Sequence, residues 1–407
     1  MSRRKTGALP ASSRASTGIS AAELESRRER LLEYVRRERL TGYVLFDASY
    51  IRYFTGFGFL STERPVVFAQ SAAGEMAVFV PEFEVERVRA ETAFERVDSY
   101  PEYPGLEHPM RILARVLAEL GIRGSIGADQ DGYPGILGYE GPALSDVTTS
   151  SVAPLAAVIE AMMVRKSEAE IGLIRESARW CEQAHRLLQE YTRPGVTEAE
   201  ASLRAGHEAT LAMLQELGDN GQQASSDGVS AGYRGQIGLR SAWAHAVAHN
   251  IEFQAGDVLV TETSAPIWGY NAELERAMII GPPTDEMRRL FDHTVAAQQV
   301  AFDALRPGVT CADVDGAVMR YFEENDLQPY WRQHTGHAIG LRNHEAPFLD
   351  LGDHTVVEPG MVFTIEPGLY APDIGGFRHS DTVAVTPNGI DVLTDYPRDI
   401  ESLTIPV

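Results

Sequence analysis

The chain has 407 residues, a length that corresponds to roughly two or three domains of ordinary size. Its 36 Lys and Arg stand against 58 Asp and Glu, so the formal net charge is −22. This balance argues against binding to nucleic acid or to an anionic lipid surface, because both need a basic footprint. Only two cysteines are present, which excludes a disulfide scaffold or a thiolate zinc cluster and predicts a cytoplasmic protein. The sequence contains no run of eighteen apolar residues, so no membrane span is expected.

Residues 1–19 contain Arg, Lys and Ser but no acidic residue and no apolar core of the kind found in secretory signals. This composition predicts a disordered N-terminal tail. An organellar transit peptide has the same composition, and that alternative stays open.

Residues 20–152 carry mixed helical and strand patterns. Ser20 and Glu23 form a capping-box pattern that begins a helix, and Gly42 is expected to end it. Gly, Pro and Ser residues between 132 and 155 mark a boundary. These patterns predict a smaller α/β N-terminal domain over 20–152. Its further expected elements are strands at 43–47, 65–70, 76–81 and 125–130 and helices near 82–94 and 109–120.

Residues 153–407 begin with a long amphipathic helical pattern that runs from 166 to about 191. The sequence Arg-Pro-Gly-Val-Thr occurs at 193–197 and again at 306–310, each time before a helical pattern. Two similar halves are therefore expected, although one loop type met twice by chance would give the same pattern. Helices followed by strands predict an α+β domain with helices packed on a curved antiparallel sheet. The clearest strands are expected at 256–264, 271–281, 360–368 and 377–386.

Three glutamates occur on the strand pair before and after the Pro266–Gly269 turn. A hairpin centred in that turn would place Glu262 and Glu273 opposite each other, with Glu275 on the same face as Glu273. Three carboxylates on one face repel each other, so they need a cation, or one of them must hold a proton. The alternative is a solvated acidic face, but the apolar flanking residues favour a buried ribbon.

Histidines and a further glutamate supply the other candidate residues. His334, His337 and His344 lie in a Gly-containing stretch, and histidine both moves protons near neutral pH and binds metals. His245 follows Ser241, and Glu366 ends an apolar strand before Pro-Gly, where a carboxylate can project into a cleft. Each histidine alone could be incidental. The stretch Gly376–Asp381 is a further polar candidate.

Together these segments resemble the creatinase/prolidase/methionine-aminopeptidase superfamily, peptidase family M24, whose catalytic domain has the pita-bread fold. The motifs occur in the family's order over nearly the whole chain after residue 20. They are SAxxH, GDVxVxE, GYxxExxR, TGHxIGL, HEAP, EPGMVFTIEPGxY and GFRxxDTV. The resemblance implies a hydrolase of C–N bonds and, because partner subunits often line the site in this family, a homodimer.

Metal-dependent members such as Xaa-Pro dipeptidases are similar through the ligands Asp, Asp, His, Glu and Glu. These positions fall here on Glu262, Glu273, His337, Glu366 and Ser380. Two aspartates are thus replaced by longer glutamates, and the last glutamate, which bridges two metals, is replaced by serine. The resemblance therefore implies an altered metal site, not a normal dinuclear centre.

The metal-free creatinase branch resembles this chain at Leu274-Glu275-Arg276. In creatinase, two glutamates hold the substrate's guanidinium and a histidine shuttles protons. By resemblance these roles fall on Glu275, Glu366 and His245, while Glu262 and Glu273 are additional acids. His344 takes the place of the catalytic histidine of prolidase.

Three functions are therefore compatible with the sequence. The first is a hydrolase that cleaves a C–N bond of a small cationic or zwitterionic substrate, with no cofactor, in which Glu262, Glu273 and His337 shape the site. Arg342 and Arg64 could bind a substrate carboxylate, although Arg64 could equally be a surface ion-pair residue. The second is an Xaa-Pro dipeptidase or aminopeptidase with one divalent ion, Mn, Zn or Co, on Glu262, Glu273, His337 and Glu366. The third is an inactive binding homologue.

Overall fold

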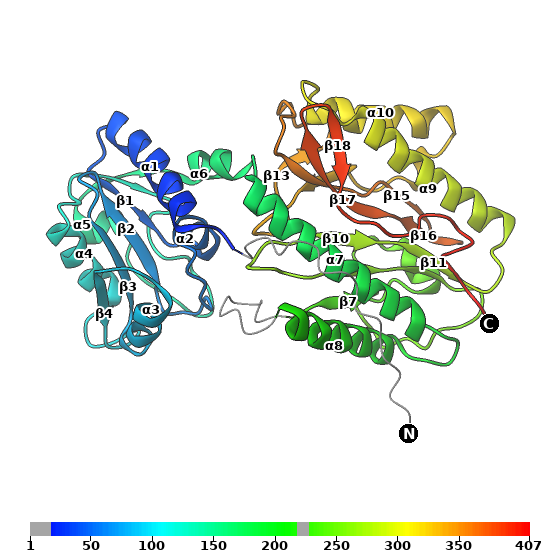
Figure 1. Ribbon diagram of the computed structural model, residues 1–407, viewed down its shortest axis with the longest axis horizontal. Coiled ribbons are helices and arrows are strands. Elements are labelled where there is room, and N and C mark those ends of the chain that lie inside the picture. Colours follow the sequence, from blue (N-terminus) through cyan, green and yellow to red (C-terminus); the bar gives the residue numbers. More distant parts are fainter. Residues whose placement is uncertain (1–17, 218–227) are drawn as a thin grey trace. The chain divides into compact units, whose positions relative to one another are not determined.

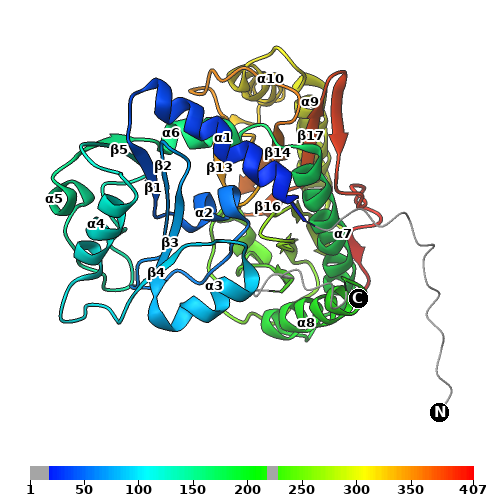
Figure 2. The same cartoon turned by 60° about the vertical axis from the view of Figure 1, so that its left-hand side comes forward.

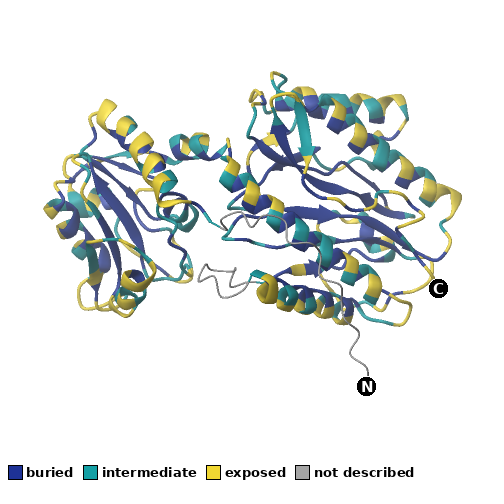
Figure 3. Ribbon diagram, in the orientation of Figure 1, coloured by how far each residue is buried: buried dark blue, intermediate teal, exposed yellow. Residues whose placement is uncertain are grey.

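The computed structural model describes residues 18–217 and 228–407 (Figure 1). The predicted disordered tail, 1–19, lies outside the described residues except for its last two positions. The chain divides into two compact units, Ile19–Arg165 and Lys166–Val407. In each unit most strands are buried, and the helices bury one face and expose the other (Figure 3). No helix in the described segments is long and apolar enough to cross a membrane.

The N-terminal unit is a mixed α/β domain, as predicted. Its six-stranded sheet has the order β4-β3-β2-β1-β5-β6, with antiparallel pairs at β1–β2 and β2–β3 and parallel pairs elsewhere. The strands are β1 (Gly42–Leu45), β2 (Val67–Ser71), β3 (Met76–Pro81), β4 (Val97–Tyr100), β5 (Ser125–Ala128) and β6 (Ser151–Pro154). The helices are α1 (Ala21–Arg37), α2 (Ala48–Thr55), α3 (Val85–Glu91), α4 (Pro109–Glu119), α5 (Leu144–Thr148) and α6 (Ala156–Met163).

The first helix begins where the capping pattern places it but ends earlier. The Ser20 hydroxyl accepts a hydrogen bond from the Glu23 amide at 3.2 Å, as an N-cap does. The helix ends at Arg37, and Gly42 is the first residue of β1, so the predicted C-terminal role of Gly42 is wrong. Glycine is needed there for a different reason: a Cβ at Gly42 would lie 2.6 Å from the Gln70 carbonyl oxygen on β2.

The C-terminal unit is a curled antiparallel sheet covered by helices, the pita-bread fold expected from the sequence. The eight-stranded sheet has the order β13-β12-β14-β17-β10-β9-β7, with β18 also on β17, and every pair in it is antiparallel. Its strands are β7 (Ser230–Gly232), β9 (Glu262–Ser264), β10 (Glu273–Glu275), β12 (Gly336–Ala338), β13 (Glu345–Leu349), β14 (Val362–Ile365), β17 (Ser380–Thr386) and β18 (Gly389–Val392). Smaller sheets contain β8 (Val258–Val260), β11 (Ala277–Ile280) and β19 (Thr404–Ile405), and β15 (Gly368–Ala371) with β16 (Gly375–Arg378).

Each long predicted strand around the glutamates is split in two. β8 and β9 are separated at Thr261, and β10 and β11 at Arg276. These two residues bind each other: the Thr261 amide donates to the Arg276 carbonyl at 3.0 Å, and the Arg276 amide donates to the Thr261 hydroxyl at 2.9 Å. The ribbon therefore passes from one sheet into another while staying paired at the bend.

The two Arg-Pro-Gly-Val-Thr loops have equivalent structures. One connects α7 (Glu168–Tyr191) to α8 (Glu198–Leu217), and the other connects α9 (Asp285–Ala304) to α10 (Cys311–Glu324). The members of each helix pair lie side by side (Figures 1 and 2). The Gly195 amide donates to Phe253 and the Gly308 amide to Val357, each at 2.9 Å. The matching contacts support the predicted two halves over the chance alternative.

Candidate active site

The three ribbon glutamates lie on β9 and β10, but in a different register from the one predicted. Glu273 is paired with Ser264, because the turn is centred on Trp268-Gly269, both with positive φ. The expectation that Glu262 and Glu273 lie opposite each other is therefore wrong. When the observed register of β9 and β10 is continued by one residue, Glu262 lies opposite Glu275.

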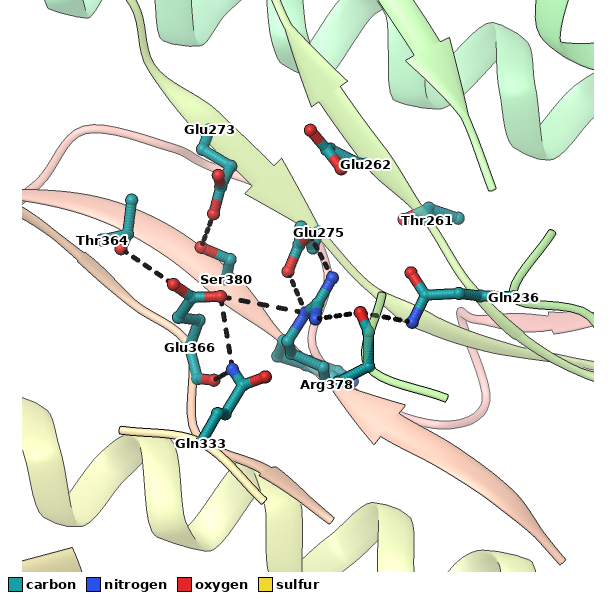
Figure 4. Close-up of polar contacts among 12 residues, drawn as sticks. Gln236, Thr261, Glu262, Glu273, Glu275, Gln333, Thr364, Glu366, Arg378 and Ser380 are labelled. Carbon is teal, nitrogen blue, oxygen red and sulfur yellow. Dashed lines mark hydrogen bonds and ion pairs between the residues drawn. The ribbon is translucent and has the colours of Figure 1, made fainter. Parts of the chain in front are cut away.

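Glu273, His337 and Glu366 form a buried cluster. Each offers a ligand atom, and these atoms all lie within 4.8 Å of one another. Among the described residues, this is the one group of three or more His, Cys, Asp or Glu side chains with that geometry. The Ser380 hydroxyl donates to Glu273 Oε1 at 2.8 Å (Figure 4). Two carboxylates and an imidazole are a donor set that Mn, Co and Zn accept.

His337 is oriented as a metal ligand would be. Its Nδ1 lies 3.0 Å from the carbonyl oxygen of Ala338, an atom that can only accept, so Nδ1 carries a proton. Its buried Nε2 lies 3.1 Å from Glu366 Oε1. A backbone carbonyl that fixes one ring nitrogen, with the other nitrogen facing a carboxylate, is the arrangement of a histidine that binds a metal together with that carboxylate. The residues present therefore fit a single divalent ion.

The pKa shifts of His337, Glu366 and Glu273 indicate which of these groups favour a charged form when no ion is bound. Burial opposes the imidazolium, but Glu366 and Glu273 outweigh it and raise the pKa of His337 to about 9. Burial also opposes the Glu366 carboxylate, but His337 and Arg378 outweigh it and lower the pKa of Glu366 to about 2. Burial, with Glu275 and Glu366 nearby, raises the pKa of Glu273 well above its usual range, which favours the protonated form.

The other two ribbon glutamates are paired with arginines. Arg378 donates from Nη2 to Glu275 Oε1 at 2.6 Å and from Nε to Oε2, a bidentate pair buried from solvent (Figure 4). Arg234 Nε lies 2.6 Å from Glu262 Oε2, and Arg234 Nη2 lies 3.6 Å from Glu275 Oε1. Burial raises the pKa of Glu275 to about 7, although Arg378 opposes this.

Sequence reasoning assigned no role to either of these arginines, although both contact the ribbon glutamates. Arg378 lies within the candidate stretch Gly376–Asp381, directly before His379 and Ser380, so a signal was present but no role was assigned. Arg234 lies in a loop whose sequence matches no motif. Arg378 Nη1 also donates to the Tyr370 hydroxyl at 3.1 Å, and the Gln333 amide donates to Glu366 Oε2 at 3.4 Å.

The remaining candidate histidines surround the cluster from the exposed side. The His344 ring stacks on the His337 ring with centroids 3.8 Å apart, and burial together with His337 lowers the pKa of His344. The His334 ring lies 6.4 Å from the His337 ring. His245 is exposed and follows Ala244, whose carbonyl accepts from Arg378 Nη1 at 3.4 Å.

The two candidate substrate-binding arginines lie in different units. The Arg342 amide donates to Glu345 Oε1 at 3.1 Å, and Glu345 is itself paired with the buried Lys166 at 2.8 Å. Arg64 belongs to the N-terminal unit, where its guanidinium contacts Glu63 and lies 2.6 Å from Glu102. The structure thus gives Arg64 the ion pairs expected of a surface residue.

Two relatives and two solved structures illustrate what this chain is similar to. A Pyrococcus horikoshii Xaa-Pro dipeptidase is 26% identical over 377 residues, covering 91% of this chain and 97% of the relative. The probable dipeptidase PepE of Mycobacterium tuberculosis is 28% identical over 380 residues, covering 90% and 93%. The crystal structure of dipeptidase PepE from Mycobacterium ulcerans has a TM-score of 0.80 at 25% identity, covering 96% and 100%. The Xaa-Pro dipeptidase from Bacillus anthracis has a TM-score of 0.77 at 26% identity, covering 94% and 100%.

Family models match both units of the chain. Residues 27–162 match the creatinase/prolidase N-terminal domain. Residues 172–387, which hold every residue of the buried cluster, match metallopeptidase family M24. The chain therefore belongs to the hydrolases of metallopeptidase family M24, as its sequence motifs predict.

Proposed function

We propose that the chain hydrolyses a C–N bond in a small dipeptide-like substrate of the Xaa-Pro class, at a centre that takes one divalent ion. Glu273, His337 and Glu366 would hold the ion. The observation that carries the proposal is the buried cluster itself: ligand atoms of Glu273, His337 and Glu366 all lie within 4.8 Å of one another, and the Ala338 carbonyl holds His337 Nδ1 at 3.0 Å, so Nε2 faces Glu366. The relatives named as dipeptidases favour this function over the creatinase-like one.

A divalent ion bound at such a site lowers the pKa of a bound water and polarises a carbonyl group. The chain's own residues would prepare the site. Ser380 and Gln333 donate hydrogen bonds to Glu273 and Glu366, which fixes the orientation of both carboxylates.

We propose that a histidine on the exposed side of the cluster transfers protons during hydrolysis. His344 stacks on His337 and is exposed, so its imidazole can reach a substrate and pass a proton to a leaving nitrogen. His245 is the second candidate for this role. Arg342 is proposed to bind the substrate carboxylate.

A metal-free hydrolase of a small cationic substrate is the second candidate. Arg234 and Arg378 balance Glu262 and Glu275 without any ion, and this observation favours it. Against it, the Glu275 carboxylate proposed to anchor a substrate cation is already engaged on both oxygens by Arg378.

Metal analysis and a dipeptide assay separate the two candidates. We expect about one equivalent of Mn, Zn or Co per chain, and Xaa-Pro hydrolysis that is lost with a chelator and restored by the ion. Glu366→Gln should abolish both. The chain offers a matched control, because Glu358 also precedes Pro-Gly but is exposed, so Glu358→Gln should keep both. Undiminished hydrolysis by metal-free protein would refute the proposal and support the second candidate.

A further inference from the structure

Of the three ribbon glutamates, only Glu273 belongs to the ion-binding cluster. We infer that Arg234 is a built-in cation that occupies Glu262 and Glu275 and thereby limits the centre to a single ion. The inference rests on the proposed function, because it assumes that the cluster of Glu273, His337 and Glu366 takes an ion.

The first support is the pattern of contacts. Arg234 reaches both glutamates that the cluster leaves out, Glu262 at 2.6 Å and Glu275 at 3.6 Å. Arg378 engages Glu275 from the other side. The two carboxylates thus face two guanidinium groups, which stay charged at every physiological pH. A second divalent ion would have to displace a resident positive charge or bind beside one.

The second support is the backbone that presents Arg234. It lies in a two-residue turn in which the Gln236 amide donates to the Tyr233 carbonyl at 2.8 Å. Arg234 has φ 50° and Gly235 has φ 73°, a left-handed conformation that residues other than glycine and asparagine rarely adopt. Keeping an arginine there costs free energy, which is typical of positions held for a function.

The third support is the anchoring of this turn. The buried carboxylate of Glu198, in the first turn of α8, accepts from the Gly235 amide at 2.5 Å and from the His249 amide at 3.2 Å. A Cβ at Gly235 would lie 2.2 Å from the Val247 carbonyl oxygen, so the turn packs closely on the loop that holds His245. Before the turn, Gly232 is the register partner of Glu262, which places Arg234 just past that glutamate.

Titration of metal-free protein with Mn²⁺ alone, followed by calorimetry, tests the inference. We expect the wild-type chain to bind about one equivalent. Arg234→Gln should bind a second equivalent, because the positive charge that pairs with Glu262 and Glu275 is gone. A stoichiometry that stays at one, at any affinity, would overturn the inference. Arg234→Lys should behave like the wild type. Arg204→Gln is the matched control, since Arg204 forms an exposed pair with Glu208 on α8 at 3.3 Å.

The origin of the effect is checked in a double variant. Arg234→Gln combined with Glu262→Gln should return to wild-type binding, because the released carboxylate is then removed as well. Circular dichroism confirms that each variant is folded. Identical Mn²⁺ binding by Arg234→Gln and the wild type would overturn the inference.

Failure of the proposed function gives a different result. If the wild-type chain binds no Mn²⁺ but Arg234→Gln does, the one-ion centre of the native chain is refuted while the role of Arg234 in excluding an ion is supported. If neither binds, both are refuted.

Discussion

Arg378 and Glu275 form a buried ion pair at the site and are 2% and 1% exposed. Arg378→Gln leaves Glu275 buried without its bidentate partner, and a broken buried ion pair costs about 3–5 kcal/mol. We therefore expect the free energy of unfolding to fall by about that amount in urea titrations. Arg378→Lys keeps the charge and should lose less. A loss below about 1 kcal/mol for Arg378→Gln would mean that Glu275 takes up a proton or is reached by solvent once Arg378 is gone.

His185 is a second buried residue with a measurable consequence. Burial, with Arg276 nearby, lowers the pKa of His185 from 6.5 to about 3. Between these values the unfolded chain takes up a proton that the folded chain does not, so stability is complete above pH 6.5 and falls as the pH drops toward 3. The contribution is up to about 1.4 kcal/mol per pH unit.

His185→Gln tests this dependence, because it removes the titrating group. Urea titrations at several pH values should give a shallower decline of unfolding free energy with acid than the wild type shows. The slope is the diagnostic quantity, since the substitution also removes the contact of Nε2 with the Thr261 hydroxyl at 2.8 Å. Parallel slopes would contradict the prediction.

At the residue scale, the sequence indicated the residues of the buried cluster but not the arginines that pair with the neighbouring glutamates. Residue type and spacing marked Glu273, His337 and Glu366 as candidates, and the family resemblance selected them as ligands together with Glu262, which the buried cluster leaves out. Arg234 is brought to Glu262 by a loop, and Glu262 itself was misplaced by two residues because the turn is centred on Trp268-Gly269. Contacts made by loops depend on tertiary packing that spacing does not encode.

At the element scale, β12 depends on a glycine beside the candidate ligand. A Cβ at Gly336 would lie 2.0 Å from the Thr364 carbonyl oxygen on β14. Gly336→Ala should therefore force the two strands apart, shift His337, lower stability by at least about 2 kcal/mol and weaken Mn²⁺ binding. Thermal unfolding and calorimetry measure both effects.

The control for this substitution lies in α7. Gly172 is exposed, and nothing lies within 4 Å of the Cβ position there. Gly172→Ala should raise stability by about 0.5–1 kcal/mol, because alanine loses less backbone entropy in a helix. Equal changes in stability for Gly336→Ala and Gly172→Ala would contradict the prediction, because the close contact at Gly336 would then have no effect on stability.

Elements with local signals were predictable, and those shaped by distant contacts were not. The long helix from Ser167 is confirmed because its capping box and its amphipathic pattern are local. The splitting of the strands at Thr261 and Arg276 was missed, because neither position is a glycine or proline that would mark a break in a strand. Only the mutual hydrogen bonds of these two residues, distant in sequence, reveal the bend.

For the whole molecule, the net charge of −22 does not describe the site. Arg234, Arg378 and His337 offset the carboxylates around the cluster. An ion held by His337 and Glu273 would have to displace the protons that the raised pKa values of these two residues favour.

Ion binding should accordingly stabilise the folded chain. An ion that binds only the native state adds about 2.7 kcal/mol at a hundredfold excess over its Kd. We expect Mn²⁺ to raise the melting temperature of the wild type by several degrees and a chelator to reverse the shift. Because the cluster lies wholly within Lys166–Val407, calorimetric scans should show the shift in the unfolding of that unit.

Glu358 and Glu366 each precede Pro-Gly, and substituting them one at a time tests whether the shift in melting temperature comes from the cluster. Glu366→Gln removes a ligand and should abolish the shift, whereas Glu358→Gln changes the same charge at an exposed position and should preserve it. A shift that survives Glu366→Gln would place the ion elsewhere on this acidic chain. Because melting is measured without substrate, the result bears on the ion site independently of which C–N bond the chain cleaves.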